Sequence, residues 1–163
     1  MSDQRDPALG TDPADIDHEL VTLAGLVLET GTALERHLAT TLRERSGIGA
    51  AAFEVLLRLA RTPAGRLRMS ELSRRLDITT GGTTRMMTRL ERDGLVRRRP
   101  SQSDRRVVYA EITDQGRAEL DRAIGPHLED LIEIFTQRMD RSDLGGLEQG
   151  LRALRSALFS DDA

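Results

Sequence analysis

The side chains of this sequence that could do chemistry are arginines gathered in its middle third. The 163-residue chain has 24 basic residues, all of them arginine, and 27 acidic ones. Residues 58–106 hold 14 arginines against 5 acids, a net charge of +9, whereas residues 1–57 and 107–163 each carry −6. Guanidinium groups bind phosphate and carboxylate oxygens through paired hydrogen bonds. The segregation of charge therefore predicts a centre that binds a polyanion, with acidic regions on both sides.

Other kinds of chemistry find little support in the sequence. The absence of cysteine excludes disulfides, cysteine zinc sites, thiol nucleophiles and thiol redox sensing. His18, His37 and His127 are too scattered to predict a metal site. No Ser/His/Asp order, pair of catalytic acids or phosphate loop stands out. We therefore expect no enzyme activity, no metal and no cofactor.

The elements that must position the arginines are expected to be mainly helical, because the core has to be built from aliphatic residues. These recur at helical spacing over residues 15–45, 49–61, 70–76, 79–93, 114–139 and 143–159. Thr79 or Thr80 should cap the fourth helix, and Gly94 should end it in a left-handed conformation.

The last two helices have their own start and stop signals. Thr113 and Ser142 are expected to cap them. Pro126 lies in the middle of the first of the two and predicts a kink or a break near Gly125.

Two strands interrupt the helical pattern after Gly94. Residues 95–99 and 107–112 alternate in polarity, and the polar segment 100–104 joins them as a turn. A short extended piece is expected at residues 66–68. The fold class is therefore mainly α with a small β-hairpin wing, a winged helix-turn-helix. Such a fold places one helix in the major groove of DNA and the basic hairpin tip on the backbone or in the minor groove.

The two ends of the chain differ from this middle. Residues 1–14 are polar and acidic and are expected to be disordered. They lack the basic and apolar stretches of a secretory signal, and no apolar run approaches the ~18 residues of a membrane span, so we expect a cytoplasmic protein without a membrane partner. The long helices at both ends carry apolar stripes that a small winged helix cannot cover.

Five short motifs resemble the MarR family of winged-helix transcriptional regulators. They are LRMSEL at 67–72, TTR at 83–85, RLERDGLV at 89–96, DRR at 104–106 and ITDQGR at 112–117. The resemblance covers about residues 16–160 in order. It implies a homodimer with helical dimerisation regions at 15–48 and 117–160 and a DNA-binding domain at 49–116.

The resemblance also implies residue roles in binding double-stranded DNA. Groove-facing positions on the recognition helix are Thr80, Gly81, Gly82, Thr83, Thr84 and Arg85, with Arg89 on phosphate or at the groove edge. In the wing, the carboxylate of Asp104 would orient Arg106 into the minor groove, while Arg105 and Arg97–Arg99 contact phosphates or pair with acids. Apart from the resemblance, backbone contacts are expected from Ser70, Arg74 and Arg75, with a solvated helix face as the alternative for the two arginines. The family often has an acid where this chain has Thr88, so an internal salt bridge is expected to be missing.

The family further implies a palindromic operator, repression, and release by a small, often aromatic, anionic ligand. The ligand pocket would lie near Leu34, His37, Phe53, Leu57, Met69 and Arg117, although most of these residues also fit an ordinary core. A regulator without ligand response, or an activator, stays an alternative. A rival of another class is an all-α dimeric interaction module whose basic middle binds an acidic protein.

Overall fold

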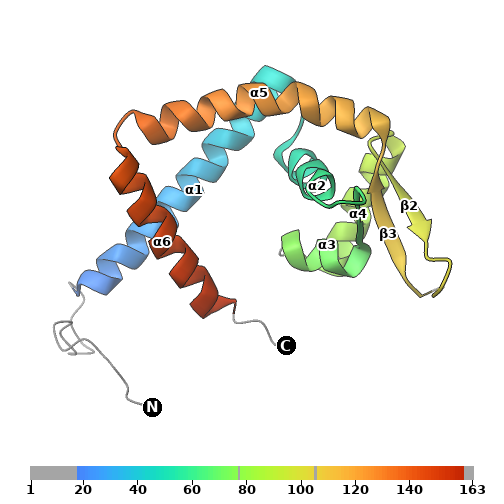
Figure 1. Cartoon of the computed structure of the whole chain (residues 1–163), viewed down its shortest axis with the longest axis horizontal. Helices are drawn as coiled ribbons and strands as arrows, with labels where there is room; N and C mark the ends of the chain where they lie inside the picture. The colour runs from blue at the N-terminus through green and yellow to red at the C-terminus, as the bar shows by residue number, and fades with distance from the viewer. Residues whose placement is uncertain (1–17, 77, 105, 160–163) are drawn as a thin grey trace, which may run out of the picture. The chain divides into compact units, whose positions relative to one another are not determined.

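A computed structural model describes residues 18–76, 78–104 and 106–159, so the segment 1–14 and Arg105 lie outside the described residues. The described chain is mainly helical with one small sheet (Figure 1). The elements, in order, are α1 (Glu19–Ser46), α2 (Ala50–Ala60), β1 (Arg66–Arg68), α3 (Met69–Leu76), α4 (Thr80–Arg92), β2 (Val96–Pro100), β3 (Val108–Ile112), α5 (Asp114–Thr136) and α6 (Arg141–Leu158). The expected fold class is confirmed.

Local capping signals fix the ends of the central helices as expected. The Thr79 hydroxyl accepts a hydrogen bond from the N–H of Gly82 at 3.1 Å, which satisfies a donor that the first turn of α4 leaves open. Gly94 follows α4 with φ +73°, a left-handed conformation that glycine adopts without steric cost. At the start of α5, Thr113 Oγ1 accepts from the N–H of Gly116 at 2.9 Å.

The cap expected for the last helix is wrong. Ser142 is not the cap of α6. Instead, Asp140 accepts from the N–H of Asp143 at 2.9 Å, and the Asp143 carboxylate accepts from the N–H of Asp140 at 3.1 Å. This reciprocal arrangement satisfies two backbone donors, which one hydroxyl could not do.

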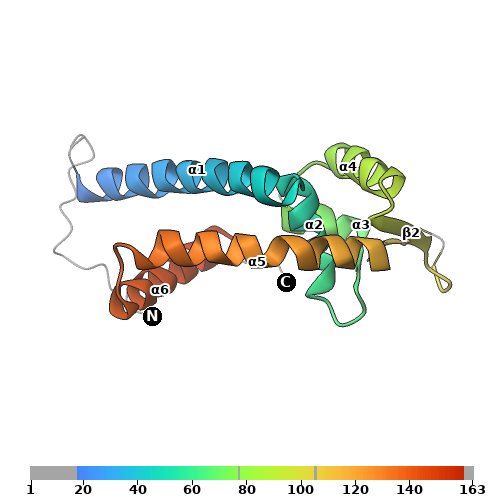
Figure 2. The same ribbon diagram turned by 90° about the horizontal axis from the view of Figure 1, so that it is seen from above.

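Of the kink or break expected near Gly125, the break does not occur, since α5 is one continuous helix (Figure 2) that contains Pro126. Proline removes one backbone donor from the helix. The backbone carbonyl of Pro126 itself accepts a hydrogen bond from Arg45 Nη1 at 2.9 Å. Arg45 also pairs with Glu129 and Asp130 on α5.

The sheet has three antiparallel strands in the order β1-β3-β2. The piece at 66–68 is thus a third strand, with Leu67 opposite Ala110. Both of these side chains are buried, and the alternation of a strand therefore turns Tyr109 and Glu111 to the outer face of the sheet.

The hydrophobic core belongs to the winged helix. All its buried apolar side chains lie between Leu42 and Ala123, and they include Leu56, Leu59, Leu72 and Met87. The chain divides into two compact units at Leu38/Ala39, and this core lies in the second. No described residue of α6 is buried, and α1 has only Leu42.

Candidate nucleic-acid interface

A buried hydrogen bond fastens the two helices of the helix-turn-helix to each other. Ser73 Oγ on α3 donates to Thr83 Oγ1 on α4 at 2.8 Å, and Thr83 Oγ1 donates to the carbonyl of Thr79 at 3.1 Å. Thr83 is completely buried. The expectation that it faces the groove is therefore wrong: its hydroxyl has to satisfy polar groups inside the protein.

The exposed surface of α4 is formed by a smaller set of residues. Gly81, Thr84, Arg85 and Arg89 are exposed, and Gly82 is half-buried. A Cβ at Gly81 would meet no atom within 4 Å, so the backbone is open to a close neighbour there. Thr80 is the first residue of α4, and its side chain lies outside the described part.

The two arginines of this surface differ in their surroundings. Arg89 lies 3.9 Å from Asp93, whereas the Arg85 guanidinium has no hydrogen-bond or ion-pair partner among the described residues. Arg85 is therefore the more available cation on the leading half of α4.

Arg98 of β2 connects the wing to α4. Its Nη2 donates to the Thr84 carbonyl at 3.1 Å and to the Thr88 hydroxyl at 2.5 Å. Glu91 accepts from the N–H of Arg98 at 3.0 Å and lies 3.7 Å from its Nε. At position 88, where the family often has an acid, the Thr88 hydroxyl accepts the hydrogen bond from Arg98. The negative charge beside Arg98 comes from Glu91 instead.

The role of Arg98 as the link was not predicted, although the sequence holds a signal for it. Alternation along β2 puts Arg98 on the face opposite Arg97 and Arg99, toward α4.

Arg97 and Arg99 both pair with Glu111 on the outer face of the sheet, at 2.8 and 2.9 Å. The hydrogen bond from Arg97 is the main cause that lowers the pKa of Glu111, and in return Glu111 raises the pKa of Arg97. Beside them, Arg66 lies 5.0 Å from the centre of the Tyr109 ring. Two arginines share one carboxylate, so this face stays positive.

At the wing tip, Asp104 shapes the backbone. Its Oδ1 accepts from the backbone N–H of Arg106 at 2.9 Å, and no bond to the Arg106 guanidinium occurs among the described residues. The side chain of Arg106 is exposed. The carboxylate therefore positions Arg106 through the turn, rather than by holding its guanidinium as expected.

The residues expected on the DNA backbone lie at the surface of α3. Ser70, Arg74 and Arg75 are exposed, and Arg75 pairs with Glu71 at 2.5 Å. Ser70 also lines a cavity of about 410 Å³ between α3 and the wing, together with Thr84, Arg98 and Arg106.

Within the second unit, the residues expected to line one ligand pocket do not line the same cavity. Phe53 is buried in the core, its ring 4.7 Å from that of His127. Leu57 and Met69 line different cavities, and Arg117 is exposed. Leu34 and His37 belong to the first unit of the chain. The expectation fails within the second unit because α2 turns Phe53 inward and Leu57 toward α3 and α6.

Neither a candidate metal site nor a membrane-spanning helix is found in the described parts of the chain. No group of three or more His, Asp or Glu side chains there could hold a metal ion. None of the helices described combines the length and apolar character needed to cross a membrane.

A helix-turn-helix held by a buried bond and followed by an antiparallel hairpin defines a winged-helix protein. The model of the MarR family matches residues 48–108. An uncharacterised HTH-type transcriptional regulator of Bacillus cereus is 33% identical over 112 residues, 69% of this chain and 73% of that protein.

Solved structures agree with this relationship. A MarR family regulator from Streptomyces coelicolor, Sco3205, in complex with DNA, is 30% identical with a TM-score of 0.79 and covers 90% of this chain and 91% of that one. A mutant MarR from E. coli complexed with operator DNA is 28% identical with a TM-score of 0.73, covering 86% and 99%. The chain belongs to the MarR family of transcriptional regulators.

Proposed function

We propose that this protein is a sequence-specific DNA-binding repressor that acts as a homodimer on a palindromic operator and is released by a small-molecule ligand. The observation that carries the DNA-binding part is the placement of two exposed arginines, Arg85 on α4 and Arg106 at the wing, on one rigidly linked winged helix. A helix of this kind reads base edges in the major groove, and a guanidinium on a wing suits the negative potential of the minor groove.

The proposed contacts follow from the surface of the described residues, and the Thr80 side chain and Arg105 are added from the sequence alone. On α4 they are Thr80, Gly81, Gly82, Thr84, Arg85 and Arg89; on the wing they are Arg97, Arg99, Asp104, Arg105 and Arg106; and on α3 they are Ser70, Arg74 and Arg75. Within this set we assign base reading to Arg85, since a neighbouring carboxylate does not hold it. Arg97 and Arg99 would serve the phosphate backbone, with Glu111 fixing their direction.

The dimer is supported by apolar side chains that the single chain leaves uncovered. They are Leu20, Leu23 and Leu26 on α1, Leu128 and Ile132 on α5, and Leu147, Leu151 and Leu154 on α6, all at least 39% exposed. Exposed stripes of this length mark association surfaces. We assign them to a helical dimerisation region at 15–48 and 117–160, with the winged helix at 49–116. Two-fold symmetry in the protein calls for a palindrome in the operator.

The test is selection of bound duplexes from a random pool, followed by titration of Arg85→Ala and Arg92→Ala. Arg92 is an exposed arginine at the other end of α4 and serves as the matched control. A bidentate base contact contributes about 1–3 kcal/mol of discrimination, so Arg85→Ala should lose about 5- to 150-fold on the selected duplex and much less on random DNA. Equal losses on both would reduce Arg85 to a phosphate contact.

The same selection and titrations distinguish this proposal from its rival, an interaction module that binds an acidic protein. If the basic middle binds DNA, the affinity falls steeply as the salt concentration rises. The duplexes that bind tightly should also share one palindrome. Absence of any enriched duplex, together with capture of an acidic protein, would favour the interaction module. A reporter gene behind the selected duplex then gives the sign of regulation, with repression expected.

A further inference from the structure

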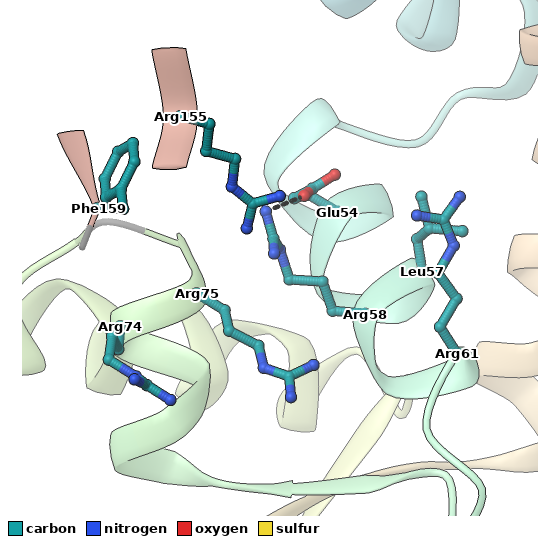
Figure 3. Close-up of a pocket in the computed structure, with 8 residues that line it drawn as sticks. All are labelled: Glu54, Leu57, Arg58, Arg61, Arg74, Arg75, Arg155 and Phe159. Atoms are coloured by element: carbon teal, nitrogen blue, oxygen red, sulfur yellow. Dashed lines mark ion pairs between the residues drawn. The ribbon is translucent and has the colours of Figure 1, made fainter. Parts of the chain in front are cut away.

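Five arginines surround one cavity of about 710 Å³ in the second unit of the chain. Arg58 comes from α2, Arg61 from the C-cap that follows this helix, Arg74 and Arg75 from α3, and Arg155 from α6 (Figure 3). We name this cavity the arginine cleft. Only one carboxylate, that of Glu54, is among its lining residues, so the lining carries a net charge of +4.

Internal pairing neutralises only part of this charge. Arg58 Nη2 pairs with Glu54 at 2.6 Å, and Arg75 pairs with Glu71, which lies outside the lining. Arg61, Arg74 and Arg155 have no side-chain partner among the described residues. In addition, Nε of Arg58 is buried and has no hydrogen-bond partner among the residues that the structure describes. A buried donor of this kind usually has a partner, and its absence points to one from outside the chain.

We propose that the arginine cleft binds an organic phosphate carrying at least two negative charges. Guanidinium groups make paired, charge-assisted hydrogen bonds to phosphate oxygens, and several of them around one anion favour a dianion or polyanion over a monocarboxylate. The volume lies within the range of about 300–1,000 Å³ typical of small-molecule sites. Leu57 and Phe159, also in the lining, offer apolar surface to the organic part of the ligand.

Arg74 gives the site a physical link to DNA. It lines the arginine cleft and also a second cavity of about 400 Å³ with Arg68, Ser70 and Glu71, on the surface of α3 assigned to the DNA backbone. A phosphate in the cleft would compete with the DNA backbone for the Arg74 guanidinium and so weaken that backbone contact. Linkage then requires the ligand to bind the DNA-free protein more tightly. This regulatory step rests on the proposed DNA-binding function, but the binding of the phosphate does not.

Binding is tested first without DNA, by calorimetric titration of the full chain with inorganic pyrophosphate at fixed ionic strength. We expect saturable binding, at least tenfold weaker with sulfate, and at least tenfold weaker in Arg61→Gln/Arg155→Gln. The control is Arg141→Gln, which removes an exposed arginine of α6 that does not line the cleft. Equal affinity for sulfate, or an equal loss in the control, would mean general attraction to anions and would overturn the proposal.

A second variant addresses a rival occupant, the acidic residues that follow Phe159 in the sequence. Asp161→Asn/Asp162→Asn should change the pyrophosphate affinity less than threefold. If pyrophosphate bound only to this variant, the cleft would be a dock for the chain's own acids, and the proposal would be wrong.

The regulatory step is tested last, on a selected duplex. Pyrophosphate should weaken binding of the wild-type protein to this duplex but not that of Arg61→Gln/Arg155→Gln. Pyrophosphate binding without an effect on DNA would refute the link through Arg74 and leave the site intact, whereas failure to select any duplex would count against the proposed function alone.

Discussion

The winged helix and the helical ends of the chain use similar aliphatic residues in opposite ways. Between Leu42 and Ala123 the chain buries a contiguous core, with Val55, Leu56, Leu59 and Leu72 fully covered. The 18 residues of α6 bury none of their leucines. A helix has to hide its apolar stripe against something. The difference teaches that the middle covers its apolar side chains within one chain, while the ends leave theirs exposed, as the proposed dimer requires.

The largest effect is expected from breaking the apolar stripe of α6. Leu151→Glu/Leu154→Glu removes four leucines from the proposed symmetric dimer, and each buried leucine contributes about 1.5–3 kcal/mol. The dissociation constant should therefore rise by more than about four orders of magnitude, with a folded monomer seen by sedimentation.

Gln149→Glu adds a charge to the opposite side of the same helix and should leave the dimer intact. A wild-type protein that is a stable folded monomer at micromolar concentration would contradict the contrast between the two regions.

The boundary between the buried core region and the uncovered end region falls within α5, where Gly116 is buried and Gly125 is exposed. A Cβ at Gly116 would overlap the carbonyl oxygen of Leu95, whereas a Cβ at Gly125 meets nothing within 4 Å apart from its own helix and its chain neighbours. Gly116→Ala should therefore destabilise by about 3 kcal/mol or prevent folding, since a buried backbone atom must move.

Gly125→Ala should instead change the stability little, because the gain from removing the flexibility of glycine in a helix is offset by contact of the new Cβ with the ring of Pro126, the next residue. Urea unfolding curves measure both. Similar effects at the two positions would show that α5 is packed alike along its length.

Thr83 tests whether the winged helix depends on its buried polar link as well as on apolar packing. Thr83→Val leaves the Ser73 hydroxyl without this partner and should cost about 1–3 kcal/mol of unfolding free energy. Thr83→Ser keeps the hydroxyl and should recover most of the hydrogen-bond contribution. If the Thr83→Val protein were as stable as the wild type, the Ser73–Thr83 hydrogen bond would contribute nothing to joining α3 and α4.

The smallest effect concerns His127, whose pKa burial lowers from the usual 6.5 against the opposing charges of Asp130 and Glu54. The folded protein favours the neutral ring, so the unfolded chain binds more protons as the pH falls below about 6.5. Stability should therefore decrease from there downward, and His127→Phe should lessen this decrease. Urea midpoints at pH 7.5 and 5.5 give the comparison, and identical pH dependence in both proteins would exclude His127 as the cause.

Sequence alone determined what depends on neighbours along the chain. Thr79 and Thr113 cap their helices, Gly94 ends α4, and the alternation in 95–112 gives the wing, because each signal acts through backbone groups a few residues away. The motifs at 67–117 were sufficient to identify the family for the same reason, because they combine such local signals in a fixed order.

Only the tertiary structure decided which side chains meet across elements. Thr83 and Arg85 lie on one helix with similar sequence signals, yet Thr83 faces Ser73 on α3 and is buried, while Arg85 faces outward. The packing of β2 on α4 brings Arg98 within hydrogen-bond distance of Thr88 and Thr84. The arginine cleft joins residues almost one hundred positions apart, from Arg58 to Arg155. A local pattern fixes the direction of a side chain relative to its own helix or strand, and only the packing of elements fixes what lies in that direction.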